Sequence, residues 1–126
     1  MVKGESKKLT ITVLNKATGL PVDCSAATGI MVGCYHEGNK VVGKWSLVSK
    51  PGFGAVDITN ANTGVLVVYL SPSQTLEAIR QKNMKAEVVV SFTNAAYPDS
   101  KQISIDTNIL VQEVENSIFE GVDPTT

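Results

Sequence analysis

Hydrophobic and polar residues alternate along most of the chain, with the two-residue period of strands that have one buried face. In the first such stretch, Leu9, Ile11 and Val13 alternate with two threonines. Further alternating or continuous apolar stretches follow at residues 30–35, 41–47, 56–59, 65–70, 87–93 and 103–111. The pattern predicts about seven strands.

Glycine, proline and asparagine separate these stretches at intervals of roughly 8 to 12 residues. Residues 37–39 predict a hairpin, and residues 51–54, 60–64 and 94–100 predict further turns. In the connection that crosses Gly19 and Pro21, we expect the chain to change sheets or to round a sandwich edge. The fold class is therefore predicted as all-β, an immunoglobulin-like antiparallel sandwich, with an eight-stranded jelly roll or a small barrel as the alternative.

Side chains of one parity share a face of a strand, which predicts what is buried. The apolar sets are Ile30, Val32 and Cys34; Val41, Trp45 and Leu47; Leu66, Val68 and Leu70; and Ile103, Ile105, Ile109 and Val111. We expect Trp45 to be the largest single piece of the core or to lie at the sheet interface. The stretch 65–70 is apolar on both faces, which is typical of a central strand or of one whose outer face is covered.

One segment carries the pattern of a helix. Ser71 stands at the expected N-cap, Pro72 at the first helical position, and Gln74 three residues after the serine, which is the capping-box arrangement. Leu76 and Ile79 lie three apart and share a helix face. The sequence predicts one short helix of two to three turns near residues 72–82, which closes an open end of the sandwich.

Composition and length indicate a single globular domain. The chain has 126 residues, of which 43% are hydrophobic and 18% charged, and its net charge is −1. We divide it into a flexible arm at residues 1–7, a sandwich domain at 8–112 and an acidic tail at 113–126. Neither a secretory signal nor an apolar run of membrane-spanning length is visible, so we expect cytosolic assembly and no membrane partner.

Candidate catalytic groups do not form a recognisable set. His36 is the only histidine and is expected to be a solvated edge residue, while Cys24 and Cys34 are expected to be buried thiols without an essential disulfide. The acids Asp23, Asp57, Glu87, Asp99 and Asp106 are scattered over turns and outer faces. We therefore predict no enzyme activity, no metal and no cofactor. Lys3, Lys7 and Lys8 lie on the expected arm and are read as solubilising, so we expect no nucleic-acid partner.

The tail carries the candidate contact residues. Four apolar side chains stand among acids there, namely Val114, Ile118, Phe119 and Val122. One reading is that they fold back onto the sandwich. The other is that the tail docks on a neighbouring protein with the aromatic residue as its anchor, which predicts a protein-contact site.

The order of motifs resembles the N-terminal immunoglobulin-like domain of phage baseplate upper proteins. The similarity includes residues 19–25 (GLPVDCS), Ala27 and Thr28, residues 54–56 (GAV), the expected helix and residues 86–88 (AEV). It covers about residues 8–112. Cys24 stands where the family usually has leucine. The family usually continues into a receptor-binding or trimerising region, whereas the sequence here ends at Thr126.

The resemblance implies a structural protein of a bacteriophage virion. As a stand-alone component, it would decorate the capsid or attach a fibre or tail part, contact other virion proteins, and form a homo-oligomer or lie in a lattice. Its location would be the virion, assembled in the host bacterial cytoplasm. The alternative function is a cell-surface module that binds carbohydrate or protein.

Overall fold

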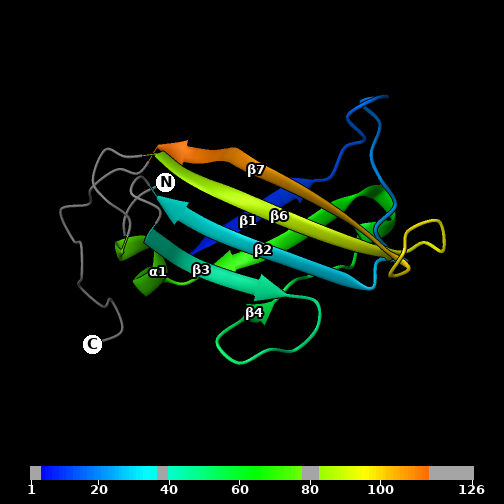
Figure 1. The fold of residues 1–126 in the computed structure, drawn as a ribbon. Coiled ribbons are helices and arrows are strands. Elements are labelled where there is room, and N and C mark those ends of the chain that lie inside the picture. Colours follow the sequence, from blue (N-terminus) through cyan, green and yellow to red (C-terminus); the bar gives the residue numbers. More distant parts are fainter. Residues whose placement is uncertain (1–3, 37–39, 78–82, 114–126) are drawn as a thin grey trace.

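The computed structural model describes residues 4–36, 40–77 and 83–113, which form two sheets and a short helix (Figure 1). The larger sheet has the strand order β4-β3-β2-β6-β7, and the smaller one pairs β1 with β5. The strands are β1 (Lys7–Thr12), β2 (Gly29–His36), β3 (Lys40–Ser46), β4 (Gly54–Ala55), β5 (Val65–Leu70), β6 (Asn83–Thr93) and β7 (Lys101–Glu113). The predicted all-β fold with two sheets and one short helix is confirmed.

The chain passes between the sheets three times. β1 lies in the small sheet, β2, β3 and β4 in the large one, β5 again in the small one, and β6 and β7 in the large one. Neighbouring strands are antiparallel except β3 and β4. The connection through Gly19 and Pro21 therefore changes sheets, as its sequence indicates.

The core lies between the two sheets and contains the side chains expected there. Ile30, Val32 and Cys34 on β2 face Leu66 and its same-parity neighbours on β5, and all are buried. Both edges of β5 are occupied, so it lies between two neighbours, which is one of the two situations expected for a strand that is apolar on both faces. β1 pairs along one edge, and Asp57 forms a bridge with Val67 on the other, through N–O distances of 2.8 and 3.1 Å.

Trp45 is buried, as predicted, and two glycines make room for its indole ring. A Cβ atom on Gly43 would lie 2.6 Å from Cη2 of Trp45, and one on Gly54 would lie 2.6 Å from Cδ1. Gly54 pairs with Trp45 across β3 and β4. The ring therefore lies flat over backbone that carries no side chain, which joins β4 to the core.

Two predictions about β3 and β4 were wrong. One concerned which side chains of β3 face the core, and the other concerned the position of the next strand. Cys34 pairs with Gly43 and Tyr35 with Val41, so that Val42 is an extra residue in β3. This bulge turns Val42 into the core and leaves Val41 half exposed, the reverse of the predicted parity. The predicted strand at 56–59 is reduced to the bridge at Asp57, and the strand itself lies at Gly54–Ala55.

The prediction that the apolar residues of the last strand all share one buried face was also wrong. Ile103 and Ile105 are each 55% exposed. The alternate residues Gln102 and Ser104 pair with Phe92 and Val90. The β6–β7 register shifts twice farther along, between Ala86 and Val88 and between Met84 and Lys85. No single alternation can therefore run through β7.

Helix α1 (Pro72–Leu76) begins as predicted but is shorter. The Ser71 Oγ accepts from the Gln74 amide nitrogen at 3.3 Å, and Gln74 Oε1 accepts from the Ser71 nitrogen at 2.8 Å, so the capping box is complete. The helix has only five residues, and residues 78–82, with the expected Ile79, lie outside the described part of the chain. Within that part, no helix has the length and hydropathy of a membrane span.

The buried Thr75 of α1 holds the start of the chain. Its Oγ1 accepts from the Gly4 nitrogen at 2.9 Å, and lies 3.0 Å from the Glu5 carbonyl oxygen, to which it can donate. β1 then begins at Lys7. The segment expected as an arm at residues 1–7 is thus attached to the helix at Gly4 and Glu5.

The packing of Trp45 predicts a position-specific effect of added methyl groups. Gly54→Ala should lower the free energy of unfolding by about 1–3 kcal/mol, because the new Cβ overlaps the indole ring. Trp45→Ala should cost about 3–5 kcal/mol through the cavity it leaves. Denaturant unfolding measures both changes.

The control is Gly33→Ala in β2, where an added Cβ meets nothing within 4 Å. In the Trp45→Ala background, Gly54→Ala should lose its cost, because the overlapping ring is gone. Equal costs for Gly54→Ala with and without Trp45 would contradict the packing described.

Candidate functional site

The two cysteines lie in the core and are free thiols. Burial raises the pKa of the Cys34 thiol to about 12. Burial, and then the nearby Asp23 carboxylate, raise the pKa of Cys24. A nucleophilic or metal-binding cysteine requires the thiolate, which both environments disfavour at neutral pH. The expectation that they are small buried side chains is confirmed.

The acidic candidates do not converge. Among the described residues, no group of three or more His, Cys, Asp or Glu side chains could hold a metal ion. Asp99 is exposed and accepts from the Lys101 nitrogen at 3.1 Å. The side chains of His36 and Asp106 lie outside the described part of the structure.

Asp23 and Asp57 each close a turn with the hydroxyl residue two positions later. Asp23 Oδ1 accepts from the Ser25 nitrogen at 2.9 Å and from the Ser25 hydroxyl at 2.5 Å. Asp57 Oδ1 accepts from the Thr59 nitrogen at 2.9 Å and hydroxyl at 2.6 Å. The two turns belong to adjoining segments, because the Cys24 nitrogen donates to the Ala61 carbonyl at 2.8 Å. Both carboxylates therefore have a structural role at one end of the sandwich.

Those hydrogen bonds favour the charged carboxylates. The Ser25 hydroxyl and nitrogen hold the pKa of Asp23 below its ordinary value. The Thr59 hydroxyl and nitrogen, and more weakly the Lys8 ammonium, lower the pKa of Asp57. The two groups are thus ionised at neutral pH and act as hydrogen-bond acceptors only.

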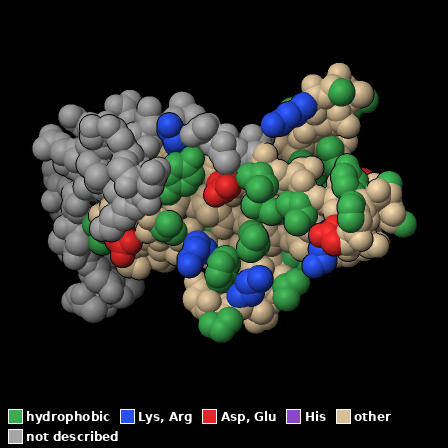
Figure 2. All heavy atoms as spheres, in the orientation of Figure 1, with side chains coloured by type: hydrophobic (Ala, Val, Ile, Leu, Met, Phe, Trp, Pro, Cys, Tyr) green, Lys and Arg blue, Asp and Glu red, His purple; other side chains and the backbone are tan. Residues whose placement is uncertain are grey.

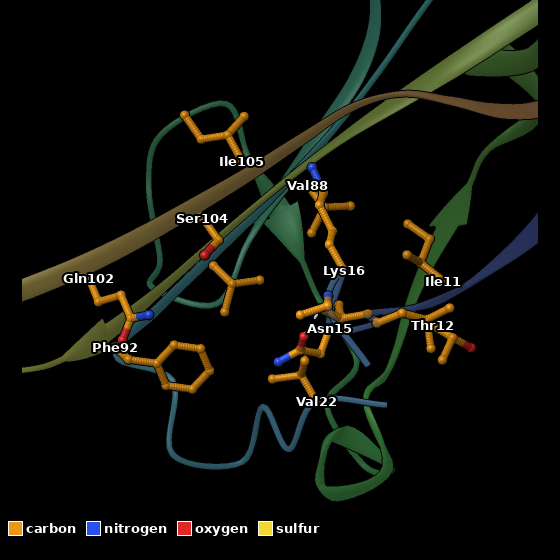
Figure 3. A pocket seen from close by; sticks show the side chains of 14 residues that line it. Ile11, Thr12, Asn15, Lys16, Val22, Val88, Phe92, Gln102, Ser104 and Ile105 are labelled. Atoms are coloured by element: carbon orange, nitrogen blue, oxygen red, sulfur yellow. Dashed lines mark hydrogen bonds between the residues drawn. The ribbon is translucent and has the colours of Figure 1, made fainter. Parts of the chain in front are cut away.

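A groove opens between the end of β1 and the inner face of β6 and β7. It has a volume of about 570 Å³. Figure 3 shows Phe92, Gln102 and Ser104 along one side and Thr12 and Val22 on the other. The full lining is Ile11, Thr12, Val13, Leu14, Asn15, Lys16, Ala17, Val22, Val88, Val90, Phe92, Gln102, Ser104 and Ile105.

The groove has an apolar base and a polar rim. Val88 and Val90 are buried in its base, and Phe92 is half buried. Gln102 and Ser104 add polar groups from β7, and Lys16 is the only charged side chain among the described residues of the lining. Such a lining can bind an apolar segment with a few polar or acidic groups.

The outer face of the large sheet carries a second apolar feature. Ile105 pairs with Val89 and Val89 with Met31, so that these side chains form a row across β7, β6 and β2. Ile103 lies two residues away on the same face and, like Ile105, is more than half exposed. We call Met31, Val89, Ile103 and Ile105 the outer row. Figure 2 shows hydrophobic side chains gathered on the face viewed there.

The sequence reasoning missed both features. Ile103 and Ile105 were grouped by parity with residues farther along β7, and the groove joins residues about 80 positions apart in the chain. The alternate positions Gln102 and Ser104 are polar although they lie beside an apolar face of β6. This pattern in the sequence could have indicated the groove. The predicted contact residues Val114, Ile118, Phe119 and Val122 lie outside the described residues.

Comparisons of the chain with protein-family models, with curated proteins and with solved structures find no match.

The two aspartate turns predict a dependence of stability on pH. A folded-state pKa below the unfolded value stabilises the fold fully above the unfolded pKa, and this contribution is lost as the pH falls through the folded pKa. We expect the carboxyl groups of Asp23 and Asp57 to titrate below about 3.9 by NMR. Ser25→Ala and Thr59→Ala should each raise the midpoint of only the partnered aspartate. Unchanged midpoints in those variants would refute the assigned cause.

Proposed function

We propose that the chain is a non-enzymatic structural protein of a bacteriophage virion. It would act as a capsid decoration or auxiliary subunit, or as a fibre- or tail-attachment subunit, through contacts with other virion proteins. The observation that carries the proposal is the outer row. Apolar side chains exposed side by side on a sheet are typical of a protein-contact surface.

The form of the outer row suits a broad contact. Gly29 and Gly33 flank Met31 on β2, and neither carries a side chain. The surface beside Met31 is therefore shallow and open to an approaching protein. Ile103 and Ile105 stand at the adjoining edge of the sheet, where they can enter depressions of a partner.

The strand pairing supports the immunoglobulin-like part of the proposal. If β1, β2, β3, β5, β6 and β7 are compared with immunoglobulin strands B, C, C′, E, F and G, the pairs β1–β5 and β2–β6 correspond to B–E and C–F. β6–β7 corresponds to F–G. The bridge of Asp57 to β5 lies where strand D would pair. Folds of this type commonly serve as assembly modules, so the inference to function is by analogy.

The residues that carry the family resemblance also occupy compatible positions. Cys24, which replaces the usual leucine, is buried and can fill part of the same apolar space. Asp23, the acid of the shared motif, closes its turn onto Ser25. Gly54 and Ala55 form β4, and Val56 is buried behind them. The positions of Asp23, Cys24 and Gly54 are thus compatible with the resemblance.

The location of the protein tests the function. Lysates of the producing bacteria would be separated on density gradients, and an antibody to the chain would be used to locate it. We expect the chain to sediment with intact phage particles in a fixed ratio to the capsid protein. Recovery in the cell envelope would favour the surface-module alternative, and recovery only in the slow-sedimenting soluble fraction would refute both.

A charge placed in the outer row tests its contribution. Ile103→Lys should leave the melting temperature nearly unchanged, because the side chain is 55% exposed, and should reduce incorporation into particles severalfold. The matched control is Tyr69→Lys, which alters a side chain of similar exposure, 56%, on β5 of the other sheet. Equal incorporation of both variants would exclude the outer row as the contact surface.

A further inference from the structure

We infer that the groove between β1 and β6–β7 receives the C-terminal tail of a second copy of this chain. The inference rests on the proposed role in assembly and names a partner for the tail. Its three supports are the chemistry of the groove, the edge of β1 that no other described strand pairs with, and the reach of the tail.

The groove matches the composition of the tail. Its base is apolar, at Val88, Val90 and Phe92, and Lys16 is the only charged residue that the described side chains contribute to its lining. Residues 113–123 contain four acids, no basic residue and the apolar residues Val114, Ile118, Phe119 and Val122. Ile118 and Phe119 can cover the apolar base while a neighbouring acid faces Lys16.

β1 offers backbone groups along the same side. The Val13 nitrogen donates to the Gly64 carbonyl at 2.8 Å, so odd-numbered residues of β1 point their backbone groups toward β5. Lys8, Thr10 and Thr12 therefore point theirs away from it. Among the described strands, β1 pairs only with β5. An incoming extended segment can add to this edge by main-chain hydrogen bonds.

The length of the tail favours a second copy over the chain's own tail. Asn83 pairs with Glu113 and Val90 with Ser104, so seven residue steps along β6, or about 23 Å, separate the end of β7 from the groove. A tail returning along the sheet uses at least about two residues to reverse, which leaves about 13 Å of reach at Phe119. On such a path Phe119 of the same chain would fall short of Ser104.

Site-directed cross-linking between full-length chains tests the inference. Copies carrying Ser104→Cys and differently tagged copies carrying Phe119→Cys would be mixed and oxidised. Figure 3 shows the Ser104 side chain directed into the groove. The native thiols are buried, with raised pKa values, and should not react while the chain is folded. We expect mixed dimers in severalfold excess over those from a Tyr69→Cys and Phe119→Cys mixture.

Further variants and conditions distinguish the tail of a second copy from other segments that could fill the groove. In the double variant carrying both cysteines, a cross-linked monomer would overturn the second-copy inference in favour of the chain's own tail. A yield equal to that of the Tyr69→Cys control would overturn any tail occupancy. Raising the salt from about 0.1 to 1 M should lower the mixed-dimer yield, because the screening length falls from about 10 to 3 Å. An unchanged yield would overturn the charge pairing with Lys16.

The test is independent of the virion proposal. It uses purified chain without particles, so cross-linking can succeed while particle association fails, and the reverse. Ile103→Lys, in the outer row, should leave the mixed-dimer yield unchanged because it lies outside the groove lining. Loss of cross-linking in that variant would place the contact on the outer row and overturn the groove as the site.

Discussion

The two sheets of this sandwich are unequal, and the inner face of five strands must be covered by two. β1 and β5 supply the buried residues opposite β2 and β6, while helix α1 and the turns at Asp23 and Asp57 close the ends. The small sheet does not cover β7, and the side chains on the inner face of that strand, Gln102 and Ser104, are polar. Apolar side chains at these two positions would stay in contact with water, and polar side chains avoid that cost. The groove follows from the same shortage of cover.

Hydrogen bonds between side chains and backbone hold the small sheet in place. Thr75 secures the segment before β1, and Asp23 and Asp57 secure the segments before β2 and β5. Gly64 permits the close approach of the end of β1, because a Cβ there would lie 2.9 Å from two carbonyl oxygens and its φ is +80°. The small sheet is thus kept against the large one by many local bonds, and the acid-dependent ones are a minority that weakens only at low pH.

The contacts proposed above use two surfaces, and they differ in symmetry. A tail that enters the groove of the next copy makes a head-to-tail contact, which generates a ring or an open array. Met31, Val89 and Ile103 of the outer row lie outside the groove lining and would then stay available for another virion protein. A small subunit that holds both kinds of contact can join its own copies and a larger assembly at once.

The sequence by itself determined most of the strands, the N-cap at Ser71 and the burial of Trp45, because alternation, capping and ring size act locally. Tertiary structure decided the bulge that buries Val42, since one extra residue opposite a neighbouring strand reverses the side chains beyond it. It decided the exposure of Ile103 as well. It also decided the groove, whose walls meet only after the sheets stack. The sequence does not specify how far a small sheet extends over a large one. That overlap determines which faces remain open for binding.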